Sequence, residues 1–292
     1  MISVLHLGLI DYATALRLQQ SLVDLRKHGR ISDVLLLLEH PPVITLGRNA
    51  SQKNLLASPD ALQKKGIELF ESNRGGDITF HGPGQLVGYP IFDLRGFSPR
   101  LGAIEFVRRV EEALIRTCGD MGIAAQRICG LTGVWTQGSD PEQRAGNCSE
   151  PLSRTSDEKK IAAIGVHISR GITSHGFALN VTADLDYFKL IVPCGITDRA
   201  VTSISRELGS LRKIPTLDQV AHTVSLNFGR VFARQMLWLE SLDSLLATAQ
   251  SEAPEEEDEI SKPVGVPLSV PDNLRRIRRE QRPGCDDEIV VV

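Results

Sequence analysis

The chain has 292 residues, 41% of them hydrophobic and 24% charged, with a formal net charge of −3. This length is long for one domain and short for two large ones, and the composition is that of a chain that buries a core. The weak net charge gives no support for nonspecific nucleic-acid binding, and no apolar run approaches the roughly 20 residues of a membrane span.

The cysteines argue for a reducing compartment. They are odd in number, and no pair has the Cys-x-x-Cys spacing, so neither a disulfide framework nor a thiolate metal site is expected. The N-terminus lacks a basic flank followed by an apolar segment, which makes a signal peptide unexpected. We therefore expect a cytoplasmic protein. The five cysteines are Cys118, Cys129, Cys148, Cys194 and Cys285.

Apolar patterning predicts strands and helices in turn along the first half of the chain. A helix should start after Asp11 and end near Gly29, a short one should start at Ser58-Pro59, and an amphipathic one should start at Ala103. Extended segments are predicted at 2–9, 34–38, 43–46, 67–70 and 86–94, and a glycine-rich segment with a short strand at 74–85.

The second half predicts paired strands and one long helix. The strand pair 160–168 and 177–181 should turn near residues 169–171, and Thr216 with Gln219 fits a capping box before a helix. Further short strands are predicted at 123–128 and 133–135, and helical turns at 184–190. Such hairpin-like pairs favour a mixed sheet, so the expected fold is α/β (α+β) with helices packed on a mixed sheet.

Two segments predict little fixed structure. Residues 137–158 are polar without an apolar period and indicate a mobile loop. After about residue 245 an acidic run, a proline-containing stretch and an arginine cluster follow one another. The predicted division is therefore a catalytic domain at 1–245 and a poorly structured charged tail at 246–292.

Cys194 is the candidate nucleophile. It lies between Pro193, which restricts the backbone, and Gly195, which leaves room for a bound acyl group. A thiol becomes reactive where a nearby ammonium favours the thiolate. Taken alone, a lone cysteine is more often a buried hydrophobic residue than a nucleophile.

Lys160 is the candidate activator. It begins the otherwise apolar segment 161–166, where a lysine can point into a pocket and favour a thiolate by its charge. The alternative is a solvated strand end, which is commoner for any one lysine. Because side chains alternate along a strand, Lys159 should point to the opposite face.

The glycine-rich stretch 74–81 could line a pocket with backbone N–H groups, although two tight turns around a hairpin strand explain it about as well. Neither of the phosphate-binding glycine motifs is present, so a nucleotide site is weakly supported. His40, His81 and His175 each lie beside a turn, but no histidine or cysteine spacing suits a metal, and no metal site is expected.

Taken together, several stretches resemble the octanoyltransferases of lipoate synthesis. The resemblance covers roughly residues 1–235 and includes Glu39-His40-Pro41 and Gly47-Arg48. Its main motifs, in the family's order, are Arg74-Gly-Gly-Asp-Ile-Thr-Phe-His-Gly-Pro-Gly-Gln85, Lys160-Ile-Ala-Ala-Ile-Gly165, Ser174-His-Gly-Phe-Ala-Leu-Asn180 and Pro193-Cys-Gly195. The segment 137–158 looks longer than the family's, and the tail after about residue 245 has no recognised counterpart.

The resemblance implies a function. Such enzymes move an octanoyl or lipoyl group from acyl carrier protein to a lysine of a lipoyl domain, as in 2-oxoacid dehydrogenase complexes and the glycine cleavage H protein, without a cofactor. Their fold is that of the biotin/lipoate protein ligases. Cys194 matches the acyl-accepting cysteine, and Lys160 matches the lysine that favours its thiolate and exchanges protons. The residues that match substrate-binding segments are Arg74, Gly75, Gly76, Asp77, Ile78, Thr79, Phe80, His81, Ala163, Ile164, Gly165, Gly176, Phe177 and Ala178, with His40 as a further pocket residue.

Two other functions compete with this one. An ATP-dependent lipoate- or biotin-protein ligase would share the fold, but a biotin ligase should carry a Gly-Arg-Gly-Arg-type loop where this chain has Arg74-Gly-Gly-Asp. A noncatalytic acyl-binding module would have no use for both Cys194 and Lys160. ATP dependence identifies the first alternative, and an unreactive Cys194 identifies the second.

Overall fold

The structure is a computed structural model, and it describes residues 1–137, 157–210, 212–251 and 288–291. The strands are β1 (Ile2–Leu9), β2 (Asp33–Glu39), β3 (Val43–Leu46), β4 (Glu68–Glu71), β5 (Ile78–His81), β6 (Gln85–Ile91), β7 (Ala125–Ile128), β8 (Leu131–Thr136), β9 (Lys160–Ser169), β10 (Ile172–Asn180), β11 (Met236–Trp238) and β12 (Glu288–Val291). The α-helices are α1 (Tyr12–Lys27), α2 (Pro59–Lys64), α3 (Ala103–Asp120), α4 (Ile204–Leu208), α5 (Leu217–Phe232) and α6 (Leu242–Ser251). Short 3₁₀ turns are η1 (Gln52–Asn54), η2 (Leu94–Gly96), η4 (Leu185–Leu190) and η5 (Pro193–Gly195).

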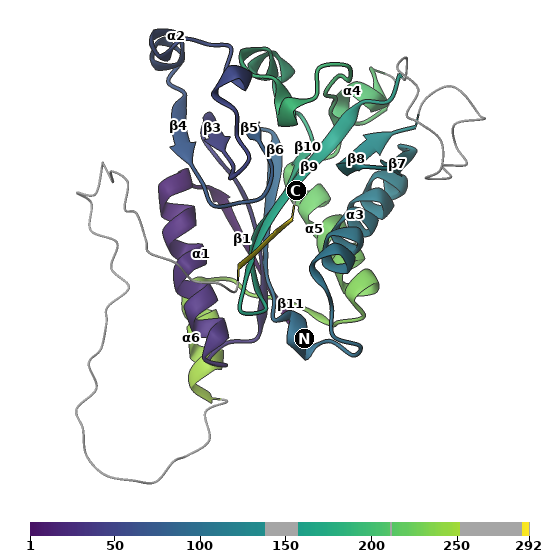
Figure 1. Ribbon diagram of the computed structural model, residues 1–292. Coiled ribbons are helices and arrows are strands. Elements are labelled where there is room, and N and C mark those ends of the chain that lie inside the picture. The colour runs from purple at the N-terminus through teal and green to yellow at the C-terminus, as the bar shows by residue number, and fades with distance from the viewer. Residues whose placement is uncertain (138–156, 211, 252–287, 292) are drawn as a thin grey trace.

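A large mixed sheet forms the centre of the molecule (Figure 1). Within the described residues, nine strands make it, in the order β11-β1-β2-β6-β10-β9-β8-β7 with β12 beside β9. A smaller sheet of order β4-β3-β5 lies at one end. The hairpin β9–β10 is antiparallel, whereas β1 runs parallel to both β2 and β11. The expected mixed sheet with packed helices is therefore confirmed.

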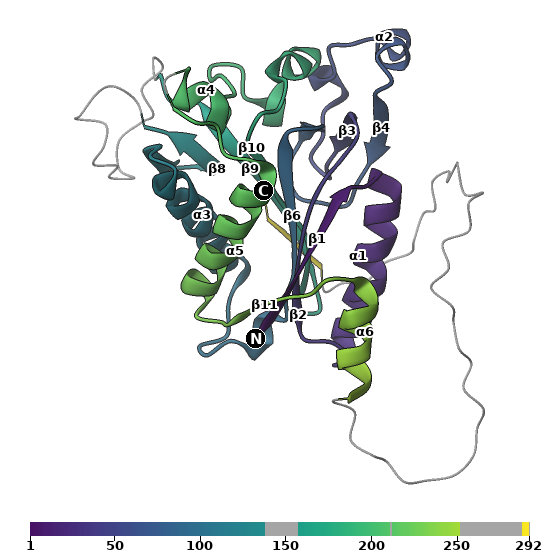
Figure 2. The ribbon, with the colours of Figure 1, turned by 180° about the vertical axis from the view of Figure 1, so that it is seen from behind.

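Helices cover both faces of the large sheet, α1 and α6 on one and α3 and α5 on the other (Figure 2). Strand β2 shows how one segment serves both layers, because its side chains alternate. Leu35 and Leu37 join the core under α3 and α5, which includes Phe106 and Phe228. Val34, Leu36 and Leu38 join the core under α1. A continuous apolar run is what a strand buried on both faces requires.

The helix starts follow the predicted capping chemistry. The Asp11 carboxylate accepts a hydrogen bond of 2.8 Å from the Thr14 N–H at the start of α1. Thr216 and Gln219 form the predicted capping box, with each side chain bound to the other residue's N–H. The short elements α4, β11 and η1 lack a pattern of their own and are absent from the sequence prediction.

The chain beyond residue 245 differs from its prediction. Helix α6 continues to Ser251, and β12 pairs antiparallel with β9 from Val166 to Ser169. The predicted boundary at residue 245 falls inside α6, because the buried Leu245 packs in the core under α1. Residues 252–287 lie outside the described residues, as do residues 138–156, which hold most of the segment predicted as a mobile loop.

Candidate active site

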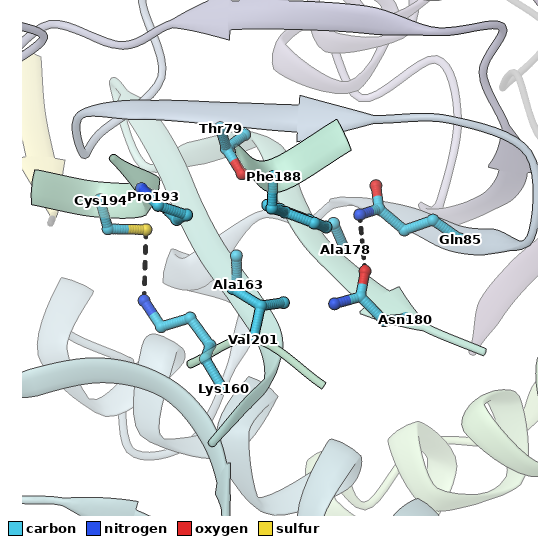
Figure 3. A pocket seen from close by; sticks show the side chains of 10 residues that line it. All are labelled: Thr79, Gln85, Lys160, Ala163, Ala178, Asn180, Phe188, Pro193, Cys194 and Val201. Atoms are coloured by element: carbon cyan, nitrogen blue, oxygen red, sulfur yellow. Dashed lines mark hydrogen bonds between the residues drawn. The ribbon is translucent and has the colours of Figure 1, made fainter. Parts of the chain in front are cut away.

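The start of β9 brings Lys160 against the nucleophile candidate. Lys160 is buried, and its backbone is fixed on both sides, because its N–H donates to Ala200 O at 2.8 Å and its C=O accepts from Thr202 N at 2.9 Å. Its Nζ donates to the Sγ of Cys194 at 3.2 Å (Figure 3). Cys194 is half-buried in η5 and has a φ of 55°, a left-handed conformation that is uncommon for a residue with a side chain.

Lys160 also lies over an aromatic ring. Its Nζ is 4.8 Å from the ring centroid of Trp135 on β8, and the guanidinium of Arg199 lies 5.6 Å from the same ring. Arg199 forms an ion pair with Glu158, and both side chains are buried. Within the described residues no carboxylate pairs with Lys160, so its ammonium faces a thiol and a ring face.

A pocket adjoins the Lys160–Cys194 pair between the two sheets. In Figure 3 the pair lies at one end of the lining, and the hydrogen-bonded amides of Gln85 and Asn180 lie at the other. Small and apolar side chains fill the wall between them. The lining residues are Thr79, Gln85, Lys160, Ala163, Ala178, Asn180, Phe188, Pro193, Cys194 and Val201.

Strand alternation divides the predicted substrate-binding segments. Segments 163–165 and 176–178 lie side by side, with Ala163 opposite Ala178. Both alanines line the pocket, whereas Ile164 and Phe177 point into the core under α3 and α5. On β5 the same rule sends Thr79 to the pocket, and Ile78 and Phe80 into the core of the small sheet. A motif match gives contiguous runs, but only alternate side chains of a strand face one side.

The glycine-rich loop before β5 is held in place by hydrogen bonds to neighbouring strands and loops of the protein. The guanidinium of Arg74 is buried and donates to the Thr45 carbonyl at 2.7 Å, the Thr45 hydroxyl at 2.9 Å and the Gly75 carbonyl at 2.9 Å. Burial lowers the pKa of Arg74 from its usual value. Gly75 N–H donates to Val166 O at 3.0 Å, and Gly47 and Asn49 N–H groups bind the carbonyls of Asp77 and Gly76. The loop is thereby fixed against β9 close to Gly165.

The predicted histidines lie in a buried cluster behind the pocket. His40 contacts the Ile10 carbonyl through Nδ1 and the Tyr89 hydroxyl through Nε2, both at 2.7 Å. Burial lowers the pKa of His40 to about 4 and that of His81 to about 3, so both imidazoles are neutral near pH 7. His81 Nδ1 lies 2.7 Å from Gln85 Oε1, which connects this cluster to the Gln85–Asn180 amide pair of the pocket.

Several residues at the site were not predicted. Gln85, Asn180 and Pro193 stand inside motif stretches, so the motif itself was their signal. Phe188 and Val201 belong to segments without a motif, and only the fold brings them to the pocket. Two further residues are likewise identified by contact alone. The Trp135 ring contacts Lys160, and Arg199 contacts the Trp135 ring. In the described part of the chain no three His, Cys, Asp or Glu side chains gather into a possible metal site.

Comparison with known proteins gives the family. Residues 11–229 match the lipoyl protein ligase A/B catalytic domain. An octanoyltransferase of Koribacter versatilis is 56% identical over 280 residues, covering 96% of this chain and 98% of that protein. An octanoyltransferase of Acidobacterium capsulatum is 58% identical over 250 residues, covering 84% and 96%. The chain belongs to the lipoyl protein ligase A/B catalytic domain family, among the octanoyltransferases. The expected acyltransferase class is thereby confirmed.

Solved structures add the fold of this family. A bipartite lipoate protein ligase of Thermoplasma acidophilum matches with a TM-score of 0.60 at 17% identity, covering 86% of this chain and 91% of that one. A lipoate-protein ligase A bound with ATP matches with a TM-score of 0.57 at 18% identity, covering 86% and 95%. At these identities the likeness concerns the fold alone. Among the described helices of this octanoyltransferase family member, none is both long and apolar enough to cross a membrane.

Proposed function

We propose that this protein transfers an octanoyl or lipoyl group from acyl carrier protein to a lysine of lipoyl domains, through a thioester on Cys194. The observation that carries the proposal is the 3.2 Å contact between Lys160 Nζ and Cys194 Sγ at the pocket wall. An ammonium at this distance favours the thiolate, which is the nucleophilic form. The curated relatives named octanoyltransferase support the same acyl group.

The proposed reaction has two steps, and in each a nucleophile attacks the carbonyl of a thioester. The Cys194 thiolate attacks the thioester carbonyl of the donor, a new C–S bond forms, and the carrier thiolate leaves and takes a proton from Lys160. The acceptor lysine, as a neutral amine, then attacks the thioester on Cys194. A C–N bond forms, the bond to Cys194 Sγ breaks, and the amine proton passes to the Lys160–Cys194 pair. The amide is more stable than a thioester, so the second step drives transfer.

The apolar side chains beside the pair are of the kind that would contact an acyl chain. Ala163, Ala178, Phe188 and Val201 form the apolar part of the pocket lining. Lipoyl domains of 2-oxoacid dehydrogenase complexes and the glycine cleavage H protein are the proposed acceptors. Cytoplasmic location belongs to the same proposal.

Intact mass spectrometry tests the proposal. The protein is mixed with octanoyl-acyl carrier protein, with and without an apo lipoyl domain. We expect one octanoyl adduct on the enzyme, none on Cys194→Ser, and discharge of the adduct onto the lipoyl domain. No adduct, together with a requirement for ATP and free octanoate, would replace the proposal with a ligase reaction. No adduct and no transfer under either condition would leave an acyl-binding module.

A further inference from the structure

The backbone around Cys194 rests on two residues that are distant from it in sequence, Asn54 and Asp77. The Val192 N–H, two residues before Cys194, donates to the Asn54 carbonyl at 2.7 Å. The Asn54 side-chain amide donates to one oxygen of the Asp77 carboxylate. Asn54 is therefore bound both to Asp77 and to the segment 192–195 that carries Cys194, called the cysteine loop below.

The same pair contacts the other side of the nucleophile. A Cβ placed on Gly195 would lie 2.9 Å from Asp77 Oδ2 and 3.4 Å from Asn54 Nδ2. The Gly195 backbone thus packs directly on the Asn54–Asp77 pair, with no room for a side chain between them. Val192, two residues before Cys194, is therefore bound to Asn54, and Gly195, directly after it, packs on both Asn54 and Asp77.

Two backbone N–H groups hold the Asp77 carboxylate in place. Its other carboxylate oxygen accepts from Ser51 N–H at 3.1 Å and from Ile78 N–H at 2.7 Å. The loop 51–57 is also bound to the residues before Cys194, because the Leu190 carbonyl accepts a hydrogen bond from Leu56 N–H at 2.9 Å. The loop 51–57 and the start of β5 therefore form the support on which the cysteine loop lies.

The support matters because the backbone of Cys194 is strained. Its φ of 55° lies in the left-handed region, which persists in a residue with a side chain only where the surroundings impose it. If the loop relaxed, Sγ would leave its place 3.2 Å from Lys160 Nζ. We infer that Asn54 and Asp77 are positioning residues that hold Cys194 in contact with Lys160.

This inference deepens the proposed function and rests on it for the role of the thiol. It also gives Asp77 a different use from the substrate binding that the motif implies, because its carboxylate oxygens are bonded to Asn54, Ser51 and Ile78. Neither Asn54 nor Asp77 lines the pocket. Their effect on the reaction should therefore appear in kcat, with KM for the acyl donor little changed.

A reciprocal exchange tests the pair. Asn54→Asp places two carboxylates face to face, so the pair should separate. The double variant Asn54→Asp/Asp77→Asn restores one donor opposite one acceptor, and its net charge equals that of the natural protein. The amide introduced at position 77 would still accept from the Ser51 and Ile78 N–H groups through its carbonyl oxygen. Asn49→Asp, at an exposed site nearby, adds the same charge as Asn54→Asp without touching the pair.

Two readouts separate positioning from fold stability. The first is the pH dependence of iodoacetamide alkylation at Cys194, followed by mass spectrometry of the tryptic peptide 190–199, because Cys129 is also exposed. The second is kcat for octanoyl transfer. We expect Asn54→Asp to move the alkylation midpoint to higher pH and to lower kcat at least tenfold. The exchange variant should return both to within about threefold of the natural protein, and Asn49→Asp should change neither.

Two results would overturn the inference. In one, Asn54→Asp lowers only the melting temperature and leaves the alkylation midpoint and kcat unchanged. In the other, the exchange variant recovers its melting temperature but stays as impaired as Asn54→Asp. Alkylation needs no acyl donor, so this readout stands even if the natural protein forms no octanoyl adduct. Failure of the proposed function and failure of the Asn54–Asp77 inference are therefore distinguishable.

Discussion

The contact between Lys160 and Cys194 predicts a specific change in thiol reactivity. Lys160→Met keeps much of the side-chain volume and removes the ammonium, so the thiolate loses its nearest cation. The pH midpoint of Cys194 alkylation should rise, and octanoyl transfer should slow by about 100-fold or more. Rates of iodoacetamide labelling across a pH series give the first quantity, and transfer to an apo lipoyl domain gives the second.

The neighbouring lysine supplies the matched control. Lys159 Nζ lies 3.5 Å from Glu207, and its side chain is 42% exposed. Lys159→Met removes the same charge one residue away and should leave both quantities within about twofold, since exposed ion pairs contribute little. An equal effect of the two substitutions would mean that only the general positive charge matters. An unchanged midpoint in Lys160→Met would remove its activating role.

At the scale of elements, the β7–β8 hairpin sets the path of the Lys160 side chain. Gly133 has a φ of 125°, and a Cβ there would lie 2.7 Å from the Ala162 carbonyl and 3.2 Å from Lys160 Cε. Gly133→Ala should therefore displace Lys160 as well as strain β8. We expect a loss of about 2–4 kcal/mol in the free energy of unfolding and a higher alkylation midpoint for Cys194. Urea denaturation and thiol labelling measure these two effects.

Gly130, at the turn of the same hairpin, allows strain and displacement to be told apart. Its φ is 77°, and an added Cβ would meet nothing within 4 Å. Gly130→Ala should lower the free energy of unfolding by about 1 kcal/mol and leave the alkylation midpoint where it is. A shift of the midpoint in both variants would show that hairpin strain, not contact with Lys160, changes the thiol.

Sequence motifs predicted the two candidate reacting residues better than their surroundings. Lys160 and Cys194 stand in short stretches whose residue types and order are specific, so they could be named without a structure. The contacts of Trp135 with Lys160 and of Asn54 with Asp77 join segments that are distant in the chain, and no local pattern marks such a pairing. Strand and helix positions followed apolar periodicity, whereas β12 depends on an open edge of β9 that only the assembled sheet defines.

At the scale of the whole molecule, a buried cluster of tyrosines and histidines joins α1, the two sheets and the β2–β3 connection. Tyr12 contacts the rings of both His40 and His81, at centroid distances of 5.3 and 6.3 Å. Tyr89 contacts His40 and His175, and His175 Nε2 lies 2.7 Å from the Asn73 side-chain oxygen. Burial, together with the nearby guanidinium of Arg74, disfavours a charged imidazole in this cluster, so protonation should weaken the packing between these layers.

Acid should therefore destabilise the fold in a window set by these histidines. Burial lowers the pKa of His40 to about 4 and of His81 and His175 to about 3, against about 6.5 in the unfolded chain. Between these values the unfolded chain binds more protons, so stability is full above about pH 6.5 and falls as the pH is lowered toward about 4. Between about pH 7.5 and about pH 5.5, proton uptake by these three histidines in the unfolded chain should lower the free energy of unfolding by roughly 4 kcal/mol. Most carboxylates titrate below this range.

Urea unfolding at about pH 7.5, 6.5 and 5.5 measures this loss, and two glutamine variants assign it. His81→Gln is less stable throughout, because its buried contacts change, but its free energy of unfolding should fall by about a third less across the window. His28→Gln removes an exposed histidine and should follow the natural protein. Equal stability of the natural protein at both ends of the window would mean that the cluster accepts protons while folded. In that case the oxygen atoms that His40 and His81 now contact would have to accept hydrogen bonds from both nitrogens of each charged ring.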